Sequence, residues 1–179
     1  MQNTIFHTPI PPLRKLTLTA MLVAMGTALA VVSKYLFGNL PVRIDLAVCP
    51  MLTVAYVLGA WWCGGAYVMV DLLSCLFLYP PFLPITLCKC ASGLLFGYML
   101  HRGGLHLKSV GVACLLNALL IDILGMTYAL YLMMETPFFP LLLTRIGGGV
   151  VNACINAAFC LLALPKLQKP MQHLLSKGN

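Results

Sequence analysis

Residues 135–149 read Glu135-Thr-Pro-Phe-Phe-Pro-Leu-Leu-Leu-Thr-Arg-Ile-Gly-Gly-Gly149 and open the last long apolar segment of the chain. Pro137 and Pro140 suit a loop followed by the first turn of a helix, whose N–H groups are unpaired in any case. Arg145 then lies about 10 Å into that helix, at a rise of roughly 1.5 Å per residue. Because a guanidinium is costly inside a membrane segment, it needs a partner, a watery cavity or a ligand.

Arg145 is the first candidate binding residue, because a guanidinium can pair with a carboxylate through two parallel hydrogen bonds. Gly147, Gly148 and Gly149 remove side chains from the next turn, so a neighbouring helix or a bound molecule can approach the backbone closely. Arg145 is therefore predicted to anchor an anionic ligand in a cavity open to one side. The alternative is that it pairs with Asp122, or caps backbone carbonyls, and so holds the bundle together.

The composition indicates an integral membrane protein. Of the 179 residues, 61% are hydrophobic and only 8% are charged, whereas charged residues make up about a quarter of a soluble domain. The net charge of +7 comes from short tails and loops, so it sets membrane topology and does not indicate a nucleic-acid partner. The eight cysteines fall mostly inside apolar runs, and we expect neither a disulfide nor a metal site.

Six apolar runs predict an all-α fold, a single bundle of six transmembrane helices in the lipid bilayer. About 20 residues span a bilayer core. The second and third runs are shorter, and Trp61-Trp62-Cys63-Gly64 is predicted to join them at a membrane interface. A cleavable signal peptide is an alternative for the first run, which however continues beyond the usual length of such a segment. The predicted spans are 16–36, 46–60, 65–79, 85–100, 109–134 and 138–164.

The basic residues outside the spans predict that both termini are cytoplasmic. Six spans place both ends on one side, and Lys and Arg are enriched in cytoplasmic loops. Only Lys34 and Arg43 then lie outside, in a predicted loop over 34–45. The predicted cytoplasmic residues are Arg14, Lys15, Arg102, Lys108, Lys166, Lys169 and Lys177. This gives a cytoplasmic tail over 1–15, a transmembrane substrate-binding bundle over 16–165 and a basic cytoplasmic tail over 166–179.

Lys89 and Arg145 are the two basic residues within the spans. Each follows the outer end of its helix by one or two turns, so both are expected at one depth, roughly a third of the way in from outside. Arg43 lies in the outer loop above them. Three cations that converge below the outer face predict a pocket for an anionic solute.

Asp71, Asn117 and Asp122 are polar residues expected at depth, and they are candidates for hydrogen bonding to a heteroaromatic ring. Asp71 is expected near the middle of the third span. Asn117 and Asp122 are five positions apart, so on an α-helix they face different directions. The alternative role is charge neutralisation, of Lys89 by Asp71 and of Arg145 by Asp122. Both roles can hold, because an unfilled pocket must still balance its charges.

Two further patterns indicate helix packing. Ala20-x-x-x-Ala24-x-x-x-Ala28 places three small residues on one face of the first span, which lets another helix lie close. That helix is either part of the bundle or part of a partner. Asn152 and Asn156 share a face of the last span, where interhelical hydrogen bonds are the expected role.

Motifs of catalysis and of nucleotide binding are missing from the sequence. Ser92-Gly93 lacks the glycine pattern of a nucleophile elbow, and the chain contains neither His-Glu-x-x-His nor a phosphate-binding loop. We therefore expect neither an enzyme nor a cofactor. Without a nucleotide site, the chain cannot itself power uphill transport.

The order and spacing of several short stretches resemble the substrate-capture (S) component of energy-coupling-factor (ECF) vitamin transporters, and within that family the folate group. The resemblance covers about residues 16–165. The stretches are Leu16-Thr-Leu-Thr-Ala-Met-Leu-Val-Ala24, Asp71-Leu-Leu73, Ala91-Ser-Gly-Leu-Leu-Phe-Gly97, Leu116-Asn117, and Pro137-Phe138 leading to Arg145.

The resemblance implies a division of labour. An S component binds its vitamin from outside the cell membrane, while a transmembrane coupling subunit and two cytoplasmic ATPase subunits form the motor. It also implies that Ala20, Ala24 and Ala28 dock on the coupling subunit, and that the S component topples in the membrane to release its cargo.

Folate is the expected ligand, with two carboxylates at one end and a flat pterin at the other. Its carboxylates call for Arg145, Lys89 and Arg43, and its pterin for Asn117 and a neighbouring acid, with the opposite orientation open. Alternatives are another vitamin or precursor, such as pantothenate or a queuosine precursor. A small membrane enzyme would need paired acids with a metal, or a nucleophile. A structural subunit of a larger complex would bind no solute.

Overall fold

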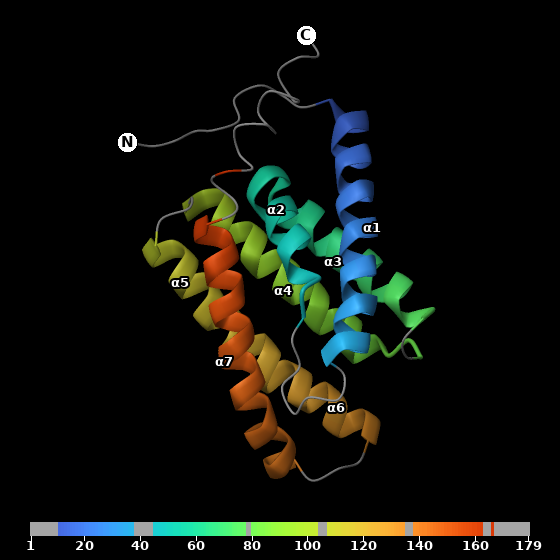
Figure 1. Ribbon diagram of the computed structural model, residues 1–179, viewed down its shortest axis with the longest axis vertical. Helices are drawn as coiled ribbons and strands as arrows, with labels where there is room; N and C mark the ends of the chain where they lie inside the picture. Colours follow the sequence, from blue (N-terminus) through green and yellow to red (C-terminus); the bar gives the residue numbers. More distant parts are fainter. Residues whose placement is uncertain are drawn as a thin grey trace.

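The computed structural model describes residues 11–37, 45–77, 80–103, 107–134, 138–162 and 166. The elements in these ranges are α1 (Pro12–Phe37), α2 (Val48–Leu58), α3 (Ala60–Cys75), α4 (Leu83–Gly103), α5 (Leu107–Leu116), the π-helix η1 (Asn117–Gly125), α6 (Met126–Met134) and α7 (Phe138–Leu162). Because α5, η1 and α6 follow one another without a break, the described elements form six helical rods (Figure 1). The predicted helical bundle is therefore confirmed.

Four of these rods are long and apolar enough to cross a membrane: α1, α4, the continuous rod α5–η1–α6, and α7. The helices α2 and α3 are shorter, with 11 and 16 residues. In Figure 1, α1 begins and α7 ends toward the upper end of the molecule, whereas α4 and α7 begin toward the lower end. The start of the first rod and the end of the last therefore lie on one side, as an even number of spans requires.

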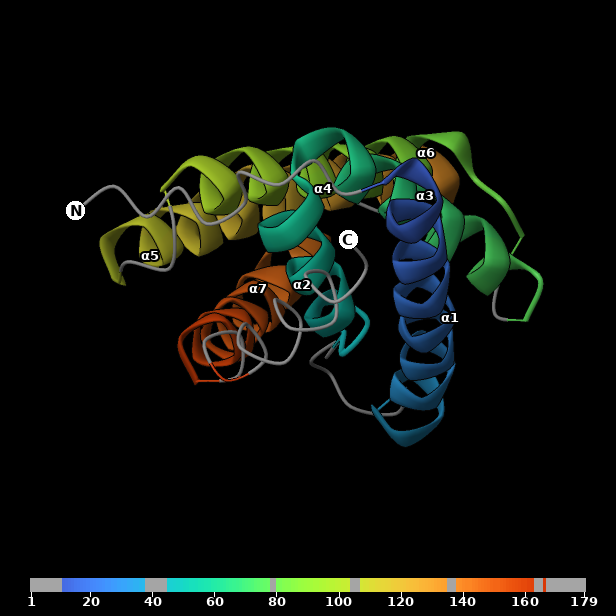
Figure 2. The ribbon, with the colours of Figure 1, turned by 90° about the horizontal axis from the view of Figure 1, so that it is seen from above.

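The short helix α2 is the centre of the core. Seen from above, it lies between α1 and α7, with α4 running across its third side (Figure 2). Met51, Leu52 and Val54 of α2 are fully enclosed, and they belong to one apolar cluster with Phe96 and Leu100 of α4. Burial on all sides explains why α2 is apolar around its whole circumference, which is typical of an internal helix.

The joint between α2 and α3 lies at Gly59, not at Trp61–Gly64 as the sequence predicted. Gly59 has a φ of 88°, a conformation that glycine adopts without steric cost. The His101 ring lies 3.5 Å from the position of a Cβ there, so a larger residue would also be crowded. The prediction placed the turn at the tryptophans, but Trp61 is in the first turn of α3 and 84% exposed.

Helices α3 and α4 pack backbone to backbone at two glycines. A Cβ on Gly97 would lie 2.3 Å from the Cα of Ala60, and a Cβ on Gly93 would lie 2.7 Å from the carbonyl oxygen of Cys63. Such contacts need small residues, as is common between membrane helices. Lys89 is one turn before Gly93 on the same face of α4, so this packing turns Lys89 toward the interior of the bundle.

The bounds predicted for the outer loop, residues 34–45, are wrong at both ends. Helix α1 continues to Phe37, so Lys34 is in its last turn. At the other end, Asp45 directly precedes the buried helix α2 and is bonded to interior residues of α4 and α7. Residues 38–44, among them the predicted ligand-binding residue Arg43, lie outside the described residues.

Candidate functional site

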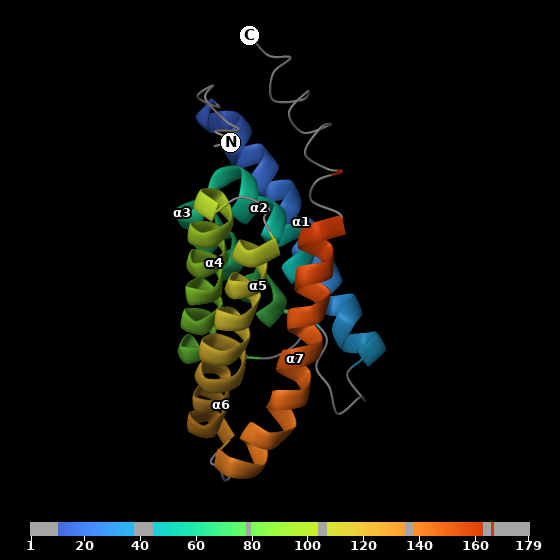
Figure 3. The same ribbon diagram turned by 90° about the vertical axis from the view of Figure 1, so that its left-hand side faces the viewer.

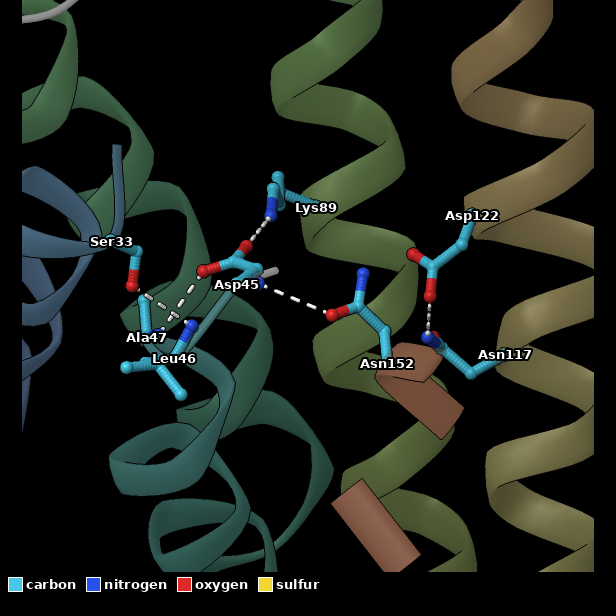
Figure 4. A network of polar contacts seen from close by, with 8 residues as sticks. All are labelled: Ser33, Asp45, Leu46, Ala47, Lys89, Asn117, Asp122 and Asn152. Carbon is cyan, nitrogen blue, oxygen red and sulfur yellow. Dashed lines mark hydrogen bonds and ion pairs between the residues drawn. The ribbon is translucent and has the colours of Figure 1, made fainter. Parts of the chain in front are cut away.

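Lys89 of α4 forms an ion pair with Asp45, with 2.6 Å between Nζ and Oδ2 (Figure 4). The two side chains are 23% and 31% exposed, so the pair lies at the edge of the core and is open on one side. The predicted partner, Asp71, instead accepts a hydrogen bond from Thr86, with 2.6 Å between the oxygens, and acts on Lys89 only as a further negative charge. The prediction failed because Asp45 was assigned to an outer loop.

The segment 45–47 connects three helices through its backbone and the Asp45 side chain. The Asp45 N–H donates to Oδ1 of Asn152 on α7, at 3.2 Å. The Leu46 N–H donates to the hydroxyl of Ser33 on α1, also at 3.2 Å, and Oδ1 of Asp45 accepts the Ala47 N–H at 3.1 Å. The segment at the start of α2 is thus held in place by bonds to α1 and α7. The interhelical role predicted for Asn152 agrees with this bond.

Asn117 and Asp122 face each other, contrary to the prediction that they point in different directions. Nδ2 of Asn117 donates to Oδ2 of Asp122 at 3.1 Å (Figure 4). The prediction assumed 3.6 residues per turn, but residues 117–125 form a π-helix. Its i→i+5 hydrogen bonding brings residues five apart onto one face. Within the described part of the chain, Oδ1 of Asn117 is enclosed and accepts no hydrogen bond.

Arg145 of α7 belongs to the same group of charges. It is half-buried, and it acts electrostatically on Asp122 and on Cys88, the neighbour of Lys89 on α4. Lys89 also acts on Asp122. One carboxylate is therefore shared electrostatically by two cations from different helices, which agrees with the predicted neutralisation of Arg145 by Asp122.

The sequence reasoning missed two residues of this group, Asp45 and Tyr67. The Tyr67 hydroxyl of α3 is enclosed, has no hydrogen-bond partner within the described residues, and is close enough to Asp45 and Asp122 to interact electrostatically with both. A signal for Asp45 was available, because it is one of only four acidic residues in the chain and directly precedes an apolar run. Tyr67 has no such signal in the sequence.

The small-residue stripe of α1 lies on the opposite side of that helix from the core. Ala20, Ala24 and Ala28 are all exposed. The inward face of α1 carries Gly26, where a Cβ would lie 3.1 Å from Val70 of α3. Ala20 and Ala24 therefore do not pack inside the bundle, and their face is available to another helix.

The arrangement brings together Lys89 of α4, Arg145 of α7, and Asn117 and Asp122 of η1; Figure 4 shows all of these except Arg145. Two cations can bind an anion, and the amide and carboxylate oxygens can accept hydrogen bonds from a ligand. In the described ranges, no three His, Cys, Asp or Glu side chains are placed to hold a metal ion together.

These features define a class, the multi-pass helical membrane proteins that collect charged groups in the interior of the bundle, where such groups mark solute sites. Residues 14–167 match the family described as ECF transporter, substrate-specific component, and the chain belongs to this family. The family is one of transporter components and not of enzymes.

A solved structure with a similar fold is the crystal structure of FolT bound with folic acid. The TM-score is 0.72 and the sequence identity 20%, over 88% of this chain and 93% of that chain. At this identity the similarity shows a shared fold. Figure 3 shows the helical rods of this chain from the side. No curated protein sequence matches the chain.

Proposed function

We propose that this chain captures folate from outside the cell for an ECF-type transporter. The observation that carries the proposal is the group of two cations, Lys89 and Arg145, beside the hydrogen-bonded pair Asn117 and Asp122 in the interior of a chain of this family. The fold shared with folate-bound FolT supports folate ahead of pantothenate or a queuosine precursor.

In the proposed complex the two ends of folate bind different parts of the group. Lys89 and Arg145 hold the carboxylates, and Arg43 is the third cation proposed for them. Oδ1 of Asn117 and the carboxylate of Asp122 accept hydrogen bonds from the amino and N–H groups of the pterin. Asp71, held by Thr86, contributes negative charge near Lys89.

Transport in this proposal needs partner subunits. The exposed face with Ala20, Ala24 and Ala28 docks on a transmembrane coupling subunit, and two cytoplasmic ATPases supply the energy. Both termini are cytoplasmic, with tails over 1–15 and 166–179. The described ends of the first and last rods, which lie on one side, support this topology.

Binding by the purified chain tests the proposal directly. We expect saturable binding of radiolabelled folate in detergent or nanodiscs, without ATP and without partner subunits. Unlabelled folate should compete, and pantothenate should not. Competition by pantothenate, or absence of saturable folate binding, would contradict the folate assignment.

A further inference from the structure

The ion pair of Lys89 leads to an inference about how a ligand enters the site. We propose that Asp45 is an internal competitor of the ligand: its carboxylate occupies Lys89 until a carboxylate of the ligand takes its place. The inference rests on the proposed function, because it requires Lys89 to bind the anionic end of the ligand. It makes Asp45 a specificity-determining residue that selects for solutes bearing a carboxylate.

The local geometry allows this exchange without a change in the fold. The backbone of Asp45 is held by Asn152, and its Oδ1 is held by the Ala47 N–H. Only Oδ2 pairs with Lys89. Because the lysine side chain is long and the pair is partly exposed, rotation of Lys89 alone can break the pair while segment 45–47 stays bonded to α1 and α7.

The electrostatics explain why an anionic ligand is needed. An ammonium without a counter-ion inside a membrane bundle is costly, so a neutral solute cannot separate Lys89 from Asp45 and leave the cation unpaired. A ligand carboxylate replaces one ion pair by another. Asp71 and Asp122 add negative charge around Lys89, but the direct ion pair of its ammonium is with Asp45.

The Tyr67 hydroxyl is an enclosed polar group close enough to Asp45 to interact with it electrostatically. It has no hydrogen-bond partner within the described residues, and it interacts electrostatically with Asp45. Buried hydroxyl groups without a partner are rare and need an explanation. The Tyr67 hydroxyl is therefore a further polar group near the ion pair for which the described residues supply no hydrogen-bond partner.

The substitution Asp45→Asn tests the competition. It keeps the oxygen that accepts the Ala47 N–H and the backbone bond to Asn152, and it removes only the charge that binds Lys89. We expect the variant to bind folate and p-aminobenzoyl-glutamate more tightly, by about tenfold if the open arrangement makes up about a tenth of the wild-type molecules. Affinity for neutral 6-hydroxymethylpterin should not rise.

A double-mutant cycle with Lys89→Met separates competition from a general effect on the fold. In the Lys89→Met background, Asp45→Asn should no longer tighten binding of p-aminobenzoyl-glutamate, because the residue for which the two carboxylates compete is gone. Thermal melting reports whether each variant is folded, and Asp45→Ser, which also keeps an oxygen acceptor near Ala47, replaces Asp45→Asn if the latter does not fold.

The outcomes distinguish this inference from the proposed function. If the wild-type chain binds folate and a folded Asp45→Asn variant binds it with equal or weaker affinity, the inference is overturned while the proposed function stands. If Asp45→Asn still increases the affinity for p-aminobenzoyl-glutamate in the Lys89→Met background, the inference is overturned as well. Wild-type chain that binds none of the three ligands overturns the proposed function, and the inference falls with it.

Discussion

At the scale of single residues, the two cations of the site lie among carboxylates. Lys89 pairs with Asp45 at 2.6 Å, and both Lys89 and Arg145 interact electrostatically with Asp122. An arginine binds a carboxylate through a planar fork and keeps its charge at any physiological pH. Arg145 is therefore the better candidate for the strongest single contact with the ligand.

Arg145→Ala should weaken folate binding at least about tenfold, because loss of a buried charged hydrogen bond costs roughly 2–5 kcal/mol. Isothermal titration calorimetry on the purified variant measures the change. The matched control is Lys108→Ala, which removes an exposed cation at the start of α5. Unchanged affinity in a folded Arg145→Ala variant would rule out Arg145 as the anchor, even if folate is the ligand.

At the scale of the elements, backbone geometry determines which side chains meet. The π-helix over 117–125 turns Asn117 and Asp122 to one face. The glycines of α4 allow α3 to approach until a Cβ on Gly97 would be 2.3 Å from Ala60. The π-helix departs from regular α-helical geometry and contains Asn117 and Asp122. The α3–α4 contact is closer than helices usually pack, and its glycines lie one to two turns after Lys89 on α4.

Gly97→Ala should destabilise the protein by about 1–3 kcal/mol, the usual cost of forcing extra atoms into a packed contact. The melting temperature in detergent measures this change. Gly111→Ala is the control, because no atom lies within 4 Å of the added Cβ and alanine is the better helix former. If both variants melt at the wild-type temperature, α3 and α4 do not pack at Gly97 as described.

At the scale of the whole molecule, the outer surface carries a small-residue face that is separate from the charged groups in the interior. Ala20 and Ala24 form a smooth exposed strip on α1, while the charged groups lie on the inner sides of α4 and α7 and at the start of α2. In the proposed function, capture of a solute and contact with a partner therefore use different sides of α1 and the bundle. Substitutions can separate the two functions.

Ala24→Leu should lower folate uptake by cells that carry the partner subunits, while folate binding by the isolated chain stays at the wild-type level. The added branched side chain disturbs a close helix contact, at a cost of roughly 1–3 kcal/mol, but it is remote from Lys89 and Arg145. Uptake assays and binding assays on the same variant are the measurement. Parallel loss of binding and uptake would mean that Ala24 supports the fold.

The proposed topology predicts opposite labelling of two positions. In a cysteine-free background, Arg43→Cys should react with an impermeant thiol reagent in intact cells, and Lys108→Cys should react only after the cells are opened. The reason is the excess of basic residues on the cytoplasmic side. The reverse pattern of labelling would show that the termini face outside.

The sequence singled out most residues of the interior charged group but few of their contacts. Polar residues are conspicuous in an apolar chain, and this is why the sequence analysis selected Lys89, Asn117, Asp122 and Arg145 as candidates. Asp45 was not, since hydropathy alone cannot distinguish an outer loop from a segment that returns into the bundle. The joint at Gly59 was missed for a related reason, because the nearby tryptophans gave a stronger interface signal than a single glycine.

By itself, the sequence determined the helical membrane bundle and most of its helical rods, because the hydropathy of a segment and its length as a helix depend only on residues close together in the chain. Only the tertiary structure decided which groups pair. Asp45 meets Lys89 across 44 residues and Asn152 across 107, and a π-helix brings Asn117 to Asp122. Such pairings depend on how helices pack and on local helical pitch, and neither is set by the hydrophobic pattern of any one segment.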